Sequence, residues 1–372
     1  MVSTKTLPIV KCNDKRSILE ALISSNIDIW SKFNIHPLTT NMRLATAAAA
    51  RARGGYITPE EEDQLNYAEM LIDVSMNRNS PWCRVIEAVD ENISRLALPF
   101  MKYYTDTEWE RALDWLYPGQ QLDHTATILC ATNESVDMWN SVAQSMNLSA
   151  PKTLMSKDIF SEVDDPHGHI ERMLTTTVLN RFRKNGIPNH ELILKIGDVC
   201  LVTRALKGLE IANNSRVLIV AIGEHTITVR TIGQNRERMI KIPRITFKFR
   251  LPYGKSYQLT RKQFPLRLAY AMTYNKSQSQ TLSKVLLDVT SPPFSHGQLY
   301  VALSRVRDCQ NIVMYLKREQ LTEIQIDRQT MSFVPTIENI VYQDVIRSKF
   351  NIHPLTTNMR LATAAAARAR GG

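Results

Sequence analysis

Residues 266 to 306 constrain the fold more than any other stretch of the chain. Two apolar segments, Leu266 to Ala271 and Val285 to Val289, are joined by a polar turn that has room for a short helix. The length and composition of both segments predict buried strands. A second, amphipathic helix is predicted from about His296 and ends in Ser304 to Arg307. This order of elements indicates an open α/β sheet.

The turn between the two strands carries eight hydrogen-bonding side chains: Thr273, Asn275, Lys276, Ser277, Gln278, Ser279, Gln280 and Thr281. They follow the carboxyl end of a strand, where open α/β sheets bind ligands. Such groups can hold phosphate oxygens or a sugar-phosphate backbone. Arg305 can project from the end of the next helix, where a guanidinium suits a developing phosphoryl charge. On the residues alone, a phosphate-handling domain and a buried strand-helix-strand unit with a polar cap remain equal alternatives.

Two long phrases in this stretch, AYAMTYNKSQSQT (269–281) and FSHGQLYVALSRVR (294–307), resemble known motifs. They are similar to motifs V and VI of the Pif-type superfamily 1 DNA helicases, including the helicase regions of Helitron transposons. The two motifs occur in the family's order, about a dozen residues apart. The resemblance covers roughly residues 7 to 347 and begins after helicase motif III. It implies a RecA-like fold, single-stranded DNA as partner, and ATP with Mg²⁺ as cofactors of the complete enzyme. It also implies roles in DNA repair, recombination, telomere maintenance or transposon replication.

The resemblance gives roles to particular residues. It implies that Arg305 stabilises the transferred phosphoryl group and that Arg43, in the phrase PLTTNMR, assists as a second nucleotide-sensing arginine. Without the resemblance, Arg43 is interpreted as a solvated or capping residue at a helix end. The residues expected to couple the nucleotide to single-stranded DNA are Thr273, Lys276, Gln278 and Thr281, and His296 and Gln298 are expected to orient the motif VI helix.

DNA contacts are expected from His296 and from the corner between a predicted strand, ATILCAT, and a predicted helix, NESVDMWNSVAQSM. Thr132 and Asn133 occupy this corner, where the amino end of a helix can hold a phosphate. An ordinary helix cap explains Thr132 and Asn133 equally well. No metal site is expected in the chain.

The chain departs from the family pattern at several points. Asn275 stands where histidine is frequent, and Ser279 replaces a glycine, which adds a side chain where a backbone could approach a ligand. Asn214, in GLEIANNSR, replaces a turn glycine, and a left-handed turn tolerates asparagine. The glycine-rich phosphate loop and the acidic pair that such an enzyme needs are missing from the sequence.

The predicted fold is α/β: a RecA-like domain with an inserted small β-barrel domain, preceded by a mostly helical segment. Short β segments separated by glycine and asparagine turns from Leu192 to about Leu251 indicate the barrel. Helices are also predicted from Thr58, which begins a capping box with Glu61, and over Asp106 to Tyr117. The predicted parts are 1–55, the end of a first RecA-like domain; 56–120, a helical connection; 121–190 and 256–335, the two parts of the second RecA-like domain; 191–255, the barrel; and 336–372, a tail.

Net charge gives little information about partners. The chain carries +10, but +8 of this comes from the segment 31–55 and its perfect duplicate at 348–372. The five cysteines form no C-x-x-C pair, so neither a disulfide framework nor a zinc site is indicated. No apolar run reaches the roughly 18 residues of a membrane span. An intracellular monomer without membrane partners is expected, in the nucleus if the source is eukaryotic.

Three functions fit these features. The first is the C-terminal portion of an ATP-dependent DNA helicase, which is expected not to hydrolyse ATP alone and whose partner would be a missing N-terminal motor half. The second is a non-enzymatic remnant that binds single-stranded nucleic acid. The third is a decayed transposon product without a function.

Overall fold

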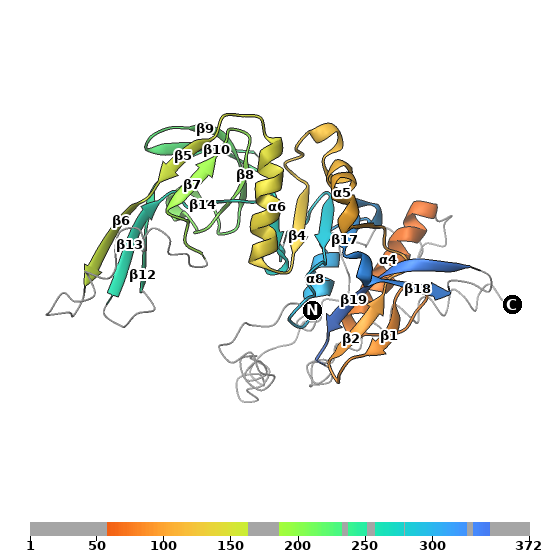
Figure 1. The fold of residues 1–372 in the computed structure, drawn as a ribbon. Helices are drawn as coiled ribbons and strands as arrows, with labels where there is room; N and C mark the ends of the chain where they lie inside the picture. The colour runs from red at the N-terminus through yellow and green to blue at the C-terminus, as the bar shows by residue number, and fades with distance from the viewer. Residues whose placement is uncertain are drawn as a thin grey trace, which may run out of the picture. The chain divides into compact units, whose positions relative to one another are not determined.

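The structure is a computed structural model, and it describes residues 58–162, 186–232, 237–250, 257–278, 280–325 and 330–342. The predictions for residues 1–55, Arg43, Ser279 and the duplicated tail lie outside these ranges. The described residues divide into two compact units (Figure 1). The first unit holds the described residues up to 119, 128–136 and those from 272 onward, and the second holds 120–127 and 137–271.

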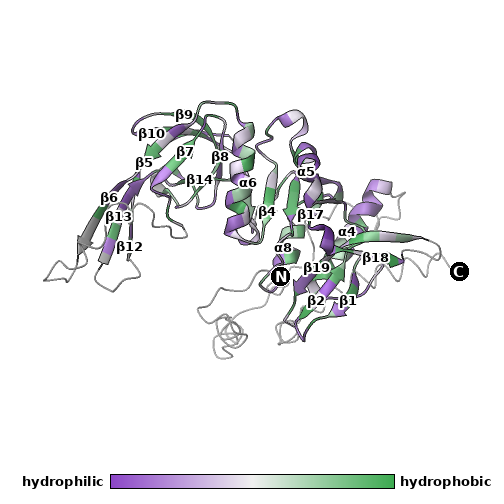
Figure 2. Ribbon diagram, viewed as in Figure 1, coloured by the Kyte–Doolittle hydropathy of each residue, from purple (hydrophilic) through white to green (hydrophobic). Residues whose placement is uncertain are grey.

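A five-stranded sheet forms the centre of the first unit, in the order β15 (Ala271–Thr273), β4 (Thr127–Cys130), β16 (Val285–Asp288), β17 (Ile312–Leu316) and β3 (Tyr103–Thr105). β17 runs parallel to both β16 and β3. Every residue of β16 and β17 is buried, and β17 is mostly hydrophobic (Figure 2). Continuous apolar runs are what parallel strands covered on both faces require. The predicted α/β class is therefore confirmed.

Three α-helices of the described residues belong wholly to this unit. α4 (Pro59–Met76) begins with the predicted capping box: Thr58 Oγ1 accepts from the Glu61 amide at 3.2 Å, and a Glu61 carboxylate oxygen accepts from the Thr58 amide at 3.0 Å. α5 (Trp109–Leu116) lies against β3 and β16, and α8 (Gln298–Leu303) lies against α4. The helix predicted over NESVDMWNSVAQSM is confirmed as α6 (Asn133–Met146), along which the chain passes from the first unit into the second.

A second, antiparallel sheet in the first unit corrects the expectation of a mostly helical connection. Its strand order is β1 (Arg84–Ala88), β2 (Ile93–Ala97), β19 (Met331–Ile340) and β18 (Leu321–Gln325). β2 pairs with β19, a strand far downstream in the sequence, so no local pattern reveals the pairing. β19 also crosses the boundary that was predicted at residue 335.

The second unit consists mainly of antiparallel strands. Its five-stranded sheet has the order β11 (Met239–Pro243), β10 (Thr226–Thr231), β9 (Arg216–Ile222), β8 (Val199–Val202) and β14 (Leu266–Leu268). A three-stranded sheet has the order β12 (Ile245–Arg250), β13 (Tyr257–Gln263) and β6 (Lys157–Glu162), and β5 (Lys152–Met155) pairs with β7 (Glu191–Leu194). The short strands predicted after Leu192 are present, but this strand order does not confirm a closed barrel. The β structure also extends on both sides of 191–255.

The apolar segment from Leu266 to Ala271 is not one strand, as was predicted, but contributes to two sheets. β14 pairs with β8 in the second unit, and β15 begins only at Ala271. Between them, the Tyr270 hydroxyl donates to the Asp198 carboxylate at 3.0 Å. Four of the six residues are buried, and the partly exposed Arg267 and Leu268 lie within β14, so neither hydropathy nor burial marks the division at Ala269 and Tyr270.

The described residues also form short 3₁₀ helices: η3 (Asp106–Glu108), η4 (Pro118–Gln120), η5 (Lys207–Leu209), η6 (Tyr274–Ser277), η7 (Cys309–Asn311) and η8 (Arg318–Gln320).

Asn214 has a φ of 63°, which confirms the left-handed turn predicted where the family has glycine. No helix of the described ranges is long and apolar enough to cross a membrane.

Candidate functional site: the junction of the polar turn and α8

The polar turn after β15 is held by hydrogen bonds from its own buried side chains. The Tyr274 hydroxyl donates to the Asp288 carbonyl at 2.6 Å, and the Ser277 hydroxyl donates to the Tyr274 carbonyl at 2.7 Å. Burial raises the pKa of Tyr274 well above its ordinary value, so the phenol stays a neutral donor. Gln280 Nε2 donates to the Lys276 carbonyl at 3.2 Å. The turn therefore has a defined backbone conformation at the edge of the sheet.

α8 is fixed at both ends by residues outside it. Gly297 precedes the helix with a φ of 71°, a left-handed conformation that favours glycine. Near the other end, the Tyr67 hydroxyl on α4 donates to the Leu303 carbonyl at 2.6 Å. Burial raises the pKa of Tyr67, so this donor also keeps its proton. Tyr67 was not predicted from the sequence, although its place on the apolar side of α4 could have indicated a buried contact.

Arg305 connects the end of α8 to the polar turn. Its side chain is buried, with the residue 6% exposed, and its Nε donates to the Val301 carbonyl at 2.6 Å. One terminal nitrogen, Nη1, donates to the carbonyls of Ser277 and Gln280 at 3.2 and 3.3 Å, and Nη2 donates to the Ser304 hydroxyl at 2.7 Å. The guanidinium thus folds back between helix and turn, whereas the sequence suggested that it projects from the helix end.

The backbone and a glutamine strengthen the same junction. The Leu282 amide donates to the Arg305 carbonyl at 3.0 Å. Gln298 is buried; its Oε1 accepts from the Phe294 amide at 2.9 Å, and its Nε2 lies 3.5 Å from Asn275 Oδ1. The two phrases that resemble motifs V and VI are therefore joined by hydrogen bonds into one connected site.

The residues predicted to couple the nucleotide to DNA lie in the turn and keep exposed surface. Thr281 is exposed, and Thr273, Lys276 and Gln278 are partly exposed. They lie in the same turn as the carbonyls that Arg305 holds. Their predicted contact with DNA stays a prediction.

His296 is fully buried, which places it among the structural contacts of the site. Its Nδ1 accepts from the Tyr342 amide at 2.9 Å, and the two rings are stacked with centroids 5.7 Å apart. A ring without exposed surface cannot touch DNA in this conformation. Its predicted role in orienting α8 stays a prediction.

Thr132 performs the capping role that was one of its two alternatives. Its Oγ1 accepts from the Ser135 amide at 3.2 Å, in the first turn of α6. Asn133 is exposed beside it. Contact of this corner with a DNA backbone stays a prediction. Within the described ranges, no group of three or more His, Cys, Asp or Glu side chains is placed to hold a metal ion.

No protein-family model matches the chain. Among curated proteins, the ATP-dependent DNA helicase Pif1 of Bdellovibrio bacteriovorus is 29% identical over 182 residues, which are 48% of this chain and 40% of that protein. The Pif1 helicase of Campylobacter jejuni is 26% identical over 203 residues, which are 53% of this chain and 43% of that protein. The chain thus spans less than half the length of these two relatives. The resemblance predicted from motifs V and VI is confirmed.

A solved structure supports the fold. This structure concerns DNA unwinding at forked double-stranded DNA by two coordinating Pif1 helicases. Its chain aligns with the present chain with a TM-score of 0.50 and 19% sequence identity. The alignment covers 84% of this chain and 58% of that one. At this identity the likeness bears on the fold alone.

Proposed function

Because the chain is a relative of the Pif1 DNA helicases, we propose that it is the half of an ATP-dependent DNA helicase that carries motifs V and VI. The observation that supports this most is the position of Arg305, whose buried guanidinium joins the motif VI helix to the motif V turn. The phosphate loop and the acidic pair for Mg²⁺ are missing from the sequence. They belong, in this proposal, to a preceding half in the same reading frame, and the chain alone does not hydrolyse ATP.

Arg305 is the residue through which this half acts on the nucleotide. Its two Nη1 bonds, at 3.2 and 3.3 Å, are longer than its Nε and Nη2 bonds, and they go to neutral carbonyls. Phosphate oxygens accept stronger, charge-assisted bonds from a guanidinium. Arg305 therefore exchanges the carbonyls of Ser277 and Gln280 for the transferred phosphoryl group, with Arg43 assisting. ATP would supply the phosphoryl group and Mg²⁺ would neutralise part of its charge, while Arg305 would stabilise the negative charge that develops during transfer.

The turn transmits the change in the hydrogen bonds of Arg305 to the bound DNA. When Arg305 releases two carbonyls of the turn, the backbone that carries Lys276 and Gln278 is free to shift. Thr273 and Thr281, at the two ends of the turn, contact the single strand with them, and Thr132 and Asn133 add a backbone contact. The protein is proposed to work as an intracellular monomer.

The proposal predicts that replacing Lys276 and Gln278 together with alanine weakens binding of single-stranded DNA about tenfold or more. One charge-assisted hydrogen bond contributes roughly 1.5–3 kcal/mol, and 1.4 kcal/mol corresponds to a factor of ten. The measurement is fluorescence anisotropy of a labelled oligothymidine titrated with the purified chain.

A matched control removes another lysine and glutamine from the first unit. Lys102 and Gln310 are exposed, and Lys102 Nζ donates to Gln310 Oε1 at 2.6 Å. Their double alanine variant is expected to bind like the wild type. Equal affinities of all three proteins would contradict the role of the turn.

A further inference from the structure

The outer face of the three-stranded sheet β12-β13-β6, in the second unit, concentrates positive charge. In the pairing of these strands, Lys262 lies opposite Lys157 on β6 and opposite Thr246 on β12. Two residues along, Thr260 lies opposite Lys248 and Ile159. Residues directly paired across antiparallel strands share one face of the sheet. The described side chains of this face are Lys157, Ile159, Thr246, Lys248, Gln258, Thr260 and Lys262, and none of them is acidic.

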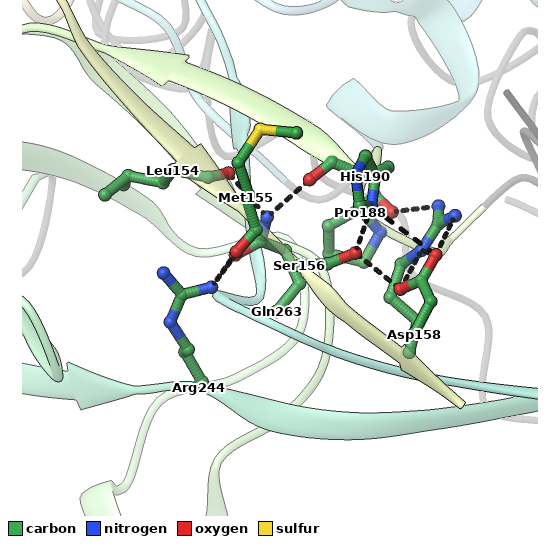
Figure 3. Close-up of polar contacts among 9 residues, drawn as sticks. Leu154, Met155, Ser156, Asp158, Pro188, His190, Arg244 and Gln263 are labelled. Carbon is green, nitrogen blue, oxygen red and sulfur yellow. Dashed lines mark hydrogen bonds and ion pairs between the residues drawn. The ribbon is translucent and has the colours of Figure 1, made fainter. Parts of the chain in front are cut away.

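The opposite face fixes this orientation because it is packed. Phe247, Phe249 and Leu259 are buried there, and so is the ion pair of Arg261 with Asp158, in which Nη2 and Oδ2 are 2.8 Å apart. Figure 3 shows Asp158 on β6 with its polar partners, which include Ser156 and His190. Since side chains alternate along a strand, burial of this face holds the lysines on the other one. All three lysines are exposed.

The arrangement of the lysines is unfavourable for the isolated protein. Like charges directly opposite each other, as in Lys157 and Lys262, destabilise a strand pair. In the described part of the chain, no ion pair joins any of the three lysines to an acid. Neighbouring strands are roughly 4.8 Å apart, so the charges reinforce one another. A polyanion on this face would remove the repulsion.

The other side chains of the face indicate which polyanion fits. Lysines and threonine hydroxyls are typical donors to phosphate oxygens, as is the amide of Gln258. Proteins that bind single strands without sequence preference stack bases on aromatic side chains, and the described side chains of this face include none. A duplex offers phosphates without exposed base faces.

We propose that this face binds the phosphodiester backbone of double-stranded DNA. It therefore adds a duplex-binding surface to the single-strand contacts of the turn. This inference rests on the proposed function, in which DNA is the substrate.

The test is the triple variant Lys157→Gln, Lys248→Gln, Lys262→Gln. Binding of a labelled blunt duplex and of a labelled oligothymidine is measured by anisotropy over a series of salt concentrations. The duplex affinity is expected to fall about tenfold or more, and the slope of log affinity against log salt to become shallower by roughly 0.9 for each lysine. Oligothymidine binding is expected to stay unchanged. The control replaces three exposed lysines elsewhere, Lys102, Lys241 and Lys317, and should leave duplex binding near the wild-type value.

The outcomes separate this inference from the proposed function. If the triple variant and the control bind the duplex equally, the inference is wrong, whereas loss of oligothymidine binding in the Lys276 and Gln278 variant still supports the proposed function. If the triple variant loses oligothymidine and duplex binding to the same extent, the face binds single strands and the duplex assignment is wrong. A wild-type chain that binds neither DNA overturns both.

Discussion

Replacing Arg305 with alanine is expected to lower the free energy of unfolding by about 3 kcal/mol. The variant leaves the carbonyls of Ser277 and Gln280 without their guanidinium donor, in a part of the chain that is largely buried. A buried polar group that loses its partner costs roughly 1–3 kcal/mol. The cavity left by the arginine side chain adds to the loss. The measurement is urea unfolding of the purified chain, followed by tryptophan fluorescence.

Arg307, two residues further on, provides the comparison because it is exposed. Its alanine variant is expected to remain within about 0.5 kcal/mol of the wild type, as surface substitutions usually do. If the two variants unfold at the same urea concentration, Arg305 does not hold the turn to α8. The proposed exchange of carbonyls for phosphate would then lose its structural basis.

Replacing Arg261 with leucine is expected to destabilise the second unit by about 3–5 kcal/mol. Arg261 is 1% exposed; its Nε lies 3.1 Å from both carboxylate oxygens of Asp158, and its Nη1 donates to the Pro188 carbonyl at 3.1 Å. Removing one partner of a buried ion pair leaves the other charge uncompensated, which costs roughly this amount. The Asp158 side chain is only 6% exposed, so water cannot replace the guanidinium easily.

A double variant distinguishes the buried charge from simple loss of packing. Leucine at both Asp158 and Arg261 removes both charges, and buried pairs replaced in this way are often neutral in stability. The double variant is therefore expected to be more stable than Arg261→Leu alone. Arg230→Leu breaks the exposed pair with Glu237, whose side chains are 39% and 57% exposed, and is expected to cost less than about 1 kcal/mol. A double variant less stable than Arg261→Leu would show that the charge is not the cause.

Local signals in the sequence predicted those elements whose structure depends on neighbouring residues. The capping box of Thr58 and Glu61 located α4, and the apolar run Val285 to Val289 located β16. The tolerance of asparagine for a left-handed turn accounted for Asn214. In each case the sequence signal lies within a few residues along the chain.

Contacts between distant segments account for what the sequence did not reveal. β2 pairs with β19, and Tyr67 bonds to Leu303, across more than half of the described chain. The motifs identified Arg305 as part of the site, but not its conformation. That conformation depends on the Ser277 and Gln280 carbonyls, and backbone acceptors leave no pattern in a sequence. The pairing of Lys157 with Lys262 likewise follows from strand register, not from local composition.

The central claim, that this chain is the motif V and VI half of a helicase motor encoded in one reading frame, is tested most directly by sequencing the RNA upstream of the codon for Met1. We predict that an in-frame glycine-rich phosphate loop and an acidic motif precede this codon. A transcript that starts at Met1, or an upstream frame without these motifs, would contradict the claim.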